Sequence, residues 1–299
     1  MANFILPTHI NYLKQVYWYR SQFTLKKLSL PLTINSAAEL FKSKNYLILN
    51  KPYDLVVYHY KKETKSMTSL YELMKDKYSY YYDPRLTGGF HVLHRLDSVT
   101  SGCICVPLNY YSQNYAAKAF ENNQVNKYYL ALVYGKVNYD EIQKFVGVGI
   151  DRDKEIVNVQ VSIGDDVRNH GYKRCTANDK TGSKLDNCAN AQKSHTQFRI
   201  LEYGTYKGRD CTKVLLKPIT GKRHQLRVVM DYLGYPIVGD TNYGVDDFDA
   251  YRTMLHSYKI EIRINTKERE FVKGKAPDPF LNSVDPDWKP HTIINELKI

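Results

Sequence analysis

The first group of residues that could do chemistry is the run His94-Arg95-Leu96-Asp97-Ser98-Val99-Thr100-Ser101-Gly102. It lies between a Gly-Gly turn and the apolar segment 103–107, which indicates a loop held by a strand, a common place for a site. The run combines an acid, basic side chains and hydroxyls, as catalysis requires. Asp followed by Ser and Thr is also common in plain turns, so the run alone leaves catalysis and turn formation open.

A second group is the run Thr220-Gly221-Lys222-Arg223-His224-Gln225-Leu226-Arg227. Its cationic and donor side chains cluster where the pattern predicts the start of a helix, and helix N-termini favour anions such as phosphate. Arg227 would lie one turn inside that helix, beside Leu226. Its side chain could stay solvated, as helix arginines usually do, or reach inward to a carboxylate.

A third group is the run Lys127-Tyr128-Tyr129-Leu130-Ala131-Leu132-Val133-Tyr134-Gly135. Strand alternation would place Tyr129, Ala131 and Val133 on one face. Tyr129 is then either a core aromatic residue or part of a site, and alternation cannot decide between the two.

The elements that must position these groups can be placed from patterns of apolar residues. Short buried strands are predicted at 46–50 and 55–58, around Lys51-Pro52. Helices are predicted after a Thr68 or Ser69 cap, after a Ser112 cap and from His224 to Gly234. Further strands are predicted at 129–134, 196–203, 212–218 and 254–264. Many strands with scattered helices indicate an α+β domain.

The three groups together resemble the signature of RluA-type pseudouridine synthases. The pattern H-R-L-D-x-x-T-S-G is intact at 94–102, and K-x-Y-x-A-L-V-x-G matches 127–135. T-G-R-x-H-Q-I/L-R matches 220–227, with Lys222 in place of the usual Arg, and L-G-x-P-I-x-G-D-x-x-Y-G matches 233–244. The tail at 276–292 is similar to the animal RNA pseudouridylate synthase domain-containing proteins. The resemblance implies an α+β pseudouridine synthase domain, with a central mixed, mainly antiparallel sheet flanked by helices and loops.

The resemblance also implies the chemistry and the residues that perform it. The enzyme would convert uridine in RNA to pseudouridine, with no metal or organic cofactor. The implied catalytic residues are Asp97 as nucleophile, Tyr129 stacked on the uracil and assisting removal of the carbon-5 proton, and Arg227 paired with Asp97. The implied substrate-binding residues are Arg95, which would fill the space of a flipped base, Leu226 beside the base, and Lys222, Arg223 and His224.

One residue departs from the family pattern. The family usually has Gly two residues after the Lys-Pro pair, and this chain has Asp54. Because a non-Gly residue disfavours positive φ, we expect a different turn there.

Composition and charge limit the partners. The chain has 43 Lys and Arg against 31 Asp and Glu, a formal net charge of +12. This excess favours a polyanion such as RNA, through release of counterions, although a basic protein of a membrane surface would also fit. The expected partner is RNA (rRNA, tRNA or mRNA), without a membrane, and we expect a monomer. No apolar run approaches the ~18 residues of a membrane span.

Cysteine usage and the N-terminus bear on location. The odd count of 5 cysteines at unrepeated spacings predicts reduced thiols in an intracellular protein, cytoplasmic or nuclear. The first acidic residue is Glu39. An acid-free basic start is compatible with a mitochondrial transit peptide or with a plain basic arm.

The expected organisation has three parts. Residues 1–40 form the basic N-terminal arm, 41–270 the catalytic domain and 271–299 a C-terminal extension. Within the domain, the polar and weakly patterned stretch 161–194 predicts a surface insertion that contributes little to stability.

Two other functions remain open at this point. The chain could be an inactive RNA-binding protein with the synthase fold, which release of tritium from carbon-5-labelled RNA would separate from an enzyme. It could also be a basic interaction protein on a membrane or ribosome, which lipid sedimentation compared with an RNA gel shift would separate.

Overall fold

The computed structural model describes residues 37–59, 68–169, 173–244, 250–264 and 270–299. The expected basic arm and its possible transit peptide lie almost entirely outside the described residues. Within the described ranges, no helix is both long enough and apolar enough to cross a membrane.

The strands of the described residues form one 12-stranded sheet, in the order β1-β2-β3-β10-β4-β9-β8-β6-β5, with β7, β11 and β12 paired to the sides of this path. Only β10 with β3 is a parallel pair, and the other pairs in the described residues are antiparallel. The strands are β1 (Glu39–Lys42), β2 (Tyr46–Lys51), β3 (Ser101–Pro107), β4 (Val125–Tyr134), β5 (Val148–Asp151), β6 (Ile156–Asp166), β7 (Arg174–Thr176), β8 (Cys188–Tyr206), β9 (Arg209–Pro218), β10 (Leu255–Arg263), β11 (Phe271–Lys275) and β12 (Trp288–Ile293). The predicted mixed, mainly antiparallel sheet of an α+β fold is confirmed.

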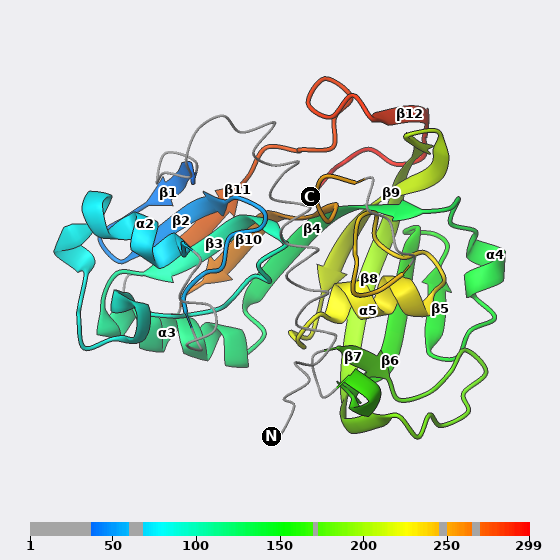
Figure 1. Cartoon of the computed structure of the whole chain (residues 1–299), viewed down its shortest axis with the longest axis horizontal. Coiled ribbons are helices and arrows are strands. Elements are labelled where there is room, and N and C mark those ends of the chain that lie inside the picture. The colour runs from blue at the N-terminus through cyan, green and yellow to red at the C-terminus, as the bar shows by residue number, and fades with distance from the viewer. Residues whose placement is uncertain (1–36, 60–67, 170–172, 245–249, 265–269) are drawn as a thin grey trace, which may run out of the picture.

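Helices cover parts of this sheet. Figure 1 shows two halves joined by β4, with α2 and α3 beside β1–β3 and with α5 beside β5–β9. The α-helices are α2 (Leu70–Lys77), α3 (Tyr110–Glu121), α4 (Tyr139–Ile142) and α5 (Gln225–Tyr232), and the 3-10 helices are η3 (Ser79–Tyr81), η4 (Thr87–Gly89) and η5 (Val167–Asn169).

Capping residues fix where the helices begin. Ser69 caps α2, since its hydroxyl accepts from the Glu72 N–H while the Glu72 carboxylate accepts from the Ser69 N–H. The predicted cap of α3 is wrong by one turn. Asn109 is the N-cap of α3, and Ser112 is its third residue, with a hydroxyl that accepts from the Asn109 N–H. Both residues can cap, and the reciprocal pair begins the helix earlier.

The segment 161–194 is mostly not the surface loop that we expected. Its start belongs to β6 and its end to β8, and these two strands pair with each other. Between them, β7 pairs with β6, with Cys175 opposite Gly164. Ile163 and Ser194 are buried. The pattern was missed because 190–193 are exposed and contain only alanine and polar residues, so the alternation of apolar residues that marks a half-buried strand is weak.

Two further segments differ from simple expectation. Asp54 itself adopts a φ of 54°, so the turn keeps the left-handed conformation that Gly would supply. Asp is one of the few residues other than Gly that adopt this conformation with some frequency. Residues after 270 join the main sheet, because β11 pairs with β10 and β12 pairs with β8. Trp288 of β12 is fully buried.

The apolar cores meet where the predicted motifs lie. One core packs between α5 and β4–β9, and a second packs under α2 and around β2 and β3. Tyr129 of β4 contacts both cores. Side chains near Tyr129 on this strand therefore lie at the junction of the two halves.

Candidate active site

A cleft of about 530 Å³ opens at this junction. Its walls are the loop 94–100, the β4 residues Lys127 and Tyr129, and the segment 220–227. The cleft brings together all of the site residues predicted from the sequence: Arg95, Asp97, Tyr129, Lys222, Arg223, His224, Leu226 and Arg227. These residues come from three separate stretches of chain, so the fold gathers what the sequence keeps apart.

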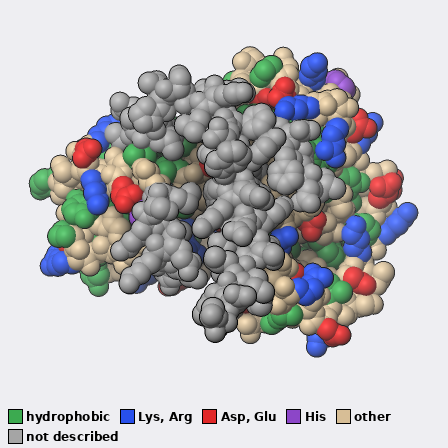
Figure 2. Space-filling view, viewed as in Figure 1, with side chains coloured by type: hydrophobic (Ala, Val, Ile, Leu, Met, Phe, Trp, Pro, Cys, Tyr) green, Lys and Arg blue, Asp and Glu red, His purple; other side chains and the backbone are tan. Residues whose placement is uncertain are grey.

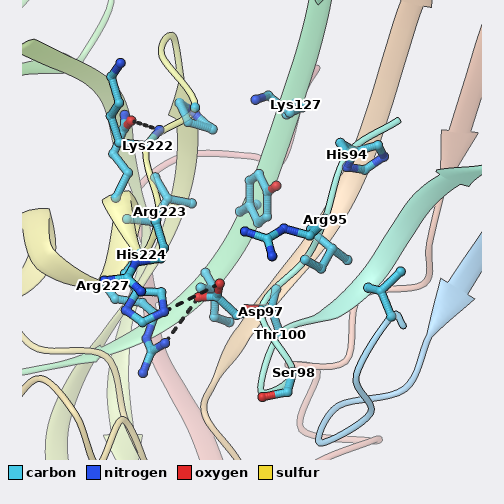
Figure 3. Close-up of a pocket in the computed structure, with 18 of the residues that line it drawn as sticks. His94, Arg95, Asp97, Ser98, Thr100, Lys127, Lys222, Arg223, His224 and Arg227 are labelled. Carbon is cyan, nitrogen blue, oxygen red and sulfur yellow. Dashed lines mark hydrogen bonds and ion pairs between the residues drawn. The ribbon is translucent and has the colours of Figure 1, made fainter. Parts of the chain in front are cut away.

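Asp97 opens the turn that leads into β3, which begins at Ser101. The Thr100 N–H donates to the Asp97 carbonyl at 3.1 Å, which closes a turn. Its carboxylate faces the cleft with 28% of the side chain exposed, and its Oδ2 accepts a hydrogen bond from Arg227 Nη1 at 3.2 Å. His224 Nε2 lies 3.8 Å from Oδ1 of the same carboxylate. Figure 3 shows both side chains reaching toward Asp97 from one side. The turn and these contacts together fix the direction of the carboxylate.

Arg227 is held by a second carboxylate. Its Nε donates to Asp240 Oδ2 at 2.6 Å and its Nη2 to Asp240 Oδ1 at 2.7 Å. The Asp240 side chain has no exposed surface, and its Oδ1 also accepts from the N–H groups of Asn242 and Tyr243. Such a two-bond pair fixes the plane of a guanidinium. Arg227 is therefore a buried, oriented donor to Asp97, and a solvated position for this helix arginine is excluded.

The charges around Asp97 favour its ionised form. Burial alone would raise the pKa of the Asp97 carboxyl, but His224, Arg227 with its hydrogen bond, and Lys51 together bring that pKa below its ordinary value. Burial lowers the pKa of His224 to about 4, so His224 is neutral near pH 7. Arg227, whose pKa is raised chiefly by Asp240 against the effect of burial, is then the permanent cation that keeps Asp97 ionised.

Tyr129 supplies an aromatic wall beside Asp97. Burial raises the pKa of its phenol, and Asp97 raises that pKa further, so the hydroxyl stays neutral. Leu226 is 6% exposed and lines the same cleft. A flat apolar group could lie against these side chains with the Asp97 carboxylate at its edge.

Basic side chains surround the mouth of the cleft. Lys222 Nζ donates to Gln192 Oε1 of β8 at 2.8 Å, and Arg223 Nη2 lies 3.5 Å from Asp165 of β6. Arg95 is exposed, and Figure 3 shows its guanidinium extending across the cleft. Figure 2 shows Lys and Arg side chains on both halves of the face seen in Figure 1, interspersed with Asp and Glu. The cleft therefore combines a basic mouth, which suits an anionic ligand, with an ionised carboxylate and an aromatic wall inside.

Two residues that support the site were not singled out from the sequence. Asp240 orients Arg227, as described above. Lys51 is fully buried, and its Nζ donates to the carbonyls of Pro52, Leu55 and Ser98. Burial lowers the pKa of Lys51 to about 7. Both stand in patterns noted above, Lys51 in the Lys-Pro pair and Asp240 in the Gly-Asp of the 233–244 motif, and those positions were the available signal.

His94 has a structural place in the same motif. Its Nε2 accepts a hydrogen bond from the Cys105 N–H at 2.9 Å, and its ring stacks on Phe120. Burial lowers the pKa of His94 to about 3, so it is neutral. The described ranges contain no group of three or more His, Cys, Asp and Glu side chains that could hold a metal ion.

Comparison with known proteins agrees with this geometry. The family model described as RNA pseudouridylate synthase matches residues 45–232. The zebrafish (Danio rerio) RNA pseudouridylate synthase domain-containing protein 1 is 33% identical, over 90% of this chain and 83% of its own length. Ribosomal large subunit pseudouridine synthase D of Borreliella burgdorferi is 30% identical, over 86% of this chain and 69% of its own.

A solved structure is similar as well. The human RNA pseudouridylate synthase domain containing 1 structure superposes with a TM-score of 0.71 at 30% identity, covering 90% of this chain and 94% of that one. The match extends beyond the motifs to the arrangement of the whole sheet.

Proposed function

Because the chain belongs to the RNA pseudouridylate synthase family, we propose that it isomerises uridine to pseudouridine in RNA, with Asp97 as the nucleophile. The observation that carries the proposal is the Asp97 carboxylate, held ionised against Arg227 inside a basic cleft. An ionised carboxylate is what covalent attack on a sugar carbon or a base requires. A protein that only bound RNA would have no need of an oriented anion where phosphates must approach.

In the proposed reaction, the Asp97 carboxylate attacks the bound nucleotide. The bond between N1 of uracil and the ribose breaks, the base turns within the cleft, and its carbon 5 bonds to carbon 1′ of the ribose. Carbon 5 then loses its proton, N1 gains one, and the carboxylate is released. Arg227 keeps Asp97 ionised and fixed in direction, which favours the attacking geometry.

The walls of the cleft would hold the base while it turns. Tyr129 stacks on the uracil and assists removal of the carbon-5 proton, and Leu226 packs on the base from α5. Arg95 occupies the place that the extruded base leaves in the RNA. Extrusion costs a few kcal/mol, which a replacement group offsets. Lys222 and Arg223 bind the neighbouring backbone, whereas His224 lies deeper in the cleft, beside Asp97.

The test is to add the purified chain to RNA from cells that lack it and to map pseudouridine in rRNA, tRNA and mRNA. We expect new pseudouridine at discrete uridines with the wild-type chain. A folded chain that binds RNA in a gel shift yet creates no pseudouridine in any RNA class would contradict the proposal and favour an inactive RNA-binding protein.

A further inference from the structure

His224 has an unusual backbone for a residue at the start of a helix. It precedes α5 with φ of 56° and ψ of 16°, and its side chain makes no capping hydrogen bond. A left-handed conformation is uncommon for a residue other than Gly, although Asn, Asp and His adopt it more often than the rest. Such a conformation persists where the surroundings fix it, often at a functional site. The imidazole it presents stands between Asp97 and Tyr243.

A chain of contacts runs through this imidazole. The Arg174 N–H of β7 donates to the Tyr243 hydroxyl oxygen at 2.8 Å, and that oxygen lies 2.7 Å from His224 Nδ1. On the other side of the ring, Nε2 lies 3.8 Å from Asp97 Oδ1. The chain thus links the backbone of β7 to the reacting carboxylate.

The hydrogens along this chain have one favourable arrangement. The Tyr243 oxygen already accepts from Arg174, so its own hydrogen is available to donate to His224 Nδ1. The single hydrogen of a neutral imidazole is then on Nε2, facing the carboxylate. The other tautomer would place a nitrogen lone pair against the Asp97 anion.

The His224 imidazole is uncharged near pH 7. Burial is the main reason that its pKa falls to about 4, with Arg227 and Arg223 lowering that pKa while Asp97 and Asp240 raise it. At neutral pH its uncharged imidazole therefore acts as an oriented N–H donor. Arg227 is the cation beside Asp97.

We propose that His224 is a positioning residue for the isomerisation, with its Nε2–H directed at Asp97 Oδ1 while Arg227 holds Oδ2, and with Tyr243 and β7 fixing the tautomer. This inference rests on the proposed function and adds a second donor to the nucleophile. The distance of 3.8 Å is slightly longer than a hydrogen bond, and such contacts often tighten only when substrate is bound. The link from Arg174 through Tyr243 also makes β7 part of the structure that supports the site.

The experiment compares two substitutions of the same residue. In His224→Gln the amide nitrogen takes the place of Nε2, whereas in His224→Asn it takes the place of Nδ1. Asn tolerates the left-handed backbone better than Gln does, so a purely conformational role ranks the two variants oppositely. We measure the single-turnover rate at saturating RNA and, separately, RNA affinity.

The expected result is a rate about 100-fold lower in His224→Asn, the scale of a misplaced reacting group. We expect His224→Gln to recover about 10-fold of that loss, with RNA affinity unchanged in both variants. An Asn variant as fast as the Gln variant, or faster, overturns the proposal. So does a loss that appears only as weaker RNA binding.

A second variant tests the tautomer. Tyr243→Phe keeps the ring that packs 5.0 Å from the Arg227 guanidinium but removes the hydroxyl, so the single-turnover rate should fall by about 10-fold. Tyr203→Phe is the matched control, because the Tyr203 hydroxyl donates a hydrogen bond to the Val137 carbonyl and does not line the cleft. Equal rates in the two variants overturn the proposal.

One readout is independent of activity. Nitrogen-15 NMR of the full wild-type chain, with the His224 signal assigned from its loss in His224→Gln, should show hydrogen on Nε2. In Tyr243→Phe that preference should weaken. Hydrogen on Nδ1 in the wild-type chain overturns this inference whatever the enzyme does, whereas a chain that converts no uridine overturns the proposed function instead.

Discussion

The Arg227 guanidinium donates to the Asp97 carboxylate at 3.2 Å, although 130 residues separate the two in sequence. Arg227 projects from α5 in one half of the molecule, and Asp97 ends a loop that leads into β3 of the other half. The carboxylate and its cation therefore meet only when both halves are folded and joined along β4.

Arg227→Met should lower turnover at neutral pH and move the acidic limb of the rate–pH profile to higher pH. Burial raises the Asp97 pKa and Arg227 lowers it, so removing the guanidinium raises that pKa. Protonation then removes the nucleophile at a higher pH, and each pKa unit corresponds to ~1.36 kcal/mol. Arg227→Lys should restore only part of the rate, since a point charge cannot reproduce the planar fork.

The measurement is kcat/KM on a substrate RNA across the acid range, with the RNA affinity recorded at each pH. An acidic limb that stays in place, together with near-normal turnover in Arg227→Met, would show that some other group holds Asp97 ionised.

The pair of Arg227 and Asp240 should be strongly coupled in stability. Both side chains are almost wholly buried, and removing one partner of such a pair typically costs ~3–5 kcal/mol because the other charge is left unpaired. We expect Asp240→Leu and Arg227→Met each to lower the free energy of unfolding on this scale. The double variant should be more stable than the sum of the two losses predicts.

Denaturant unfolding measures this coupling. Arg85→Ala is the control, because its pair with Asp83 lies at the surface, with the Arg85 side chain 87% exposed, and should contribute little. Additive losses in the double variant would mean that the two side chains act independently.

The local elements of the site could be predicted from the sequence, for identifiable reasons. The apolar spacing around Leu226, Val229 and Met230 marks the start of α5, and the apolar run 129–134 marks the strand that carries Tyr129. Ser69 has a Glu three residues later, a pattern typical of a helix start. These signals lie within a few residues of the positions that they determine.

What could not be predicted depends on distant partners. No local pattern shows that Asp240 would pair with Arg227, or that the Tyr243 hydroxyl would accept a hydrogen bond from the Arg174 N–H. The strands in 161–194 were missed because polar side chains cover their exposed parts, and their pairing is with each other. Asp54 at positive φ was missed because only the surrounding fold imposes it.

RNA affinity should depend on salt, with slopes that report individual contacts. The net charge of +12 predicts a linear fall of log affinity with log salt concentration. Lys222→Ala and Arg223→Ala should each make that slope shallower by about one contact. Lys154→Ala is a control, because Lys154 is exposed, pairs with Asp151 and does not line the cleft. Affinity that is insensitive to salt would rule out the phosphate-binding role.

Deletion of 161–194 should now be strongly destabilising, contrary to the expectation from its composition. The deletion removes the β6–β8 pairing at one end, together with β7 and the buried Ile163. With a short Gly/Ser bridge in its place, we expect the melting temperature to fall by more than ~10 °C, a loss of several kcal/mol for a protein of this size. A melting temperature within a few degrees of the wild-type value would instead return this segment to the role of a dispensable insertion.

The most direct test of the central claim is release of tritium from RNA labelled at carbon 5 of uridine, measured for the wild-type chain and for Asp97→Asn. Forming the new bond at carbon 5 displaces its hydrogen, so the wild-type chain should release tritium in proportion to the pseudouridine made. Asp97→Asn keeps the shape of the side chain but removes the nucleophilic anion. It should therefore release none while its melting temperature and RNA affinity stay near wild type. Tritium release by Asp97→Asn at the wild-type rate would contradict the mechanism, because Asp97 could not then be the nucleophile.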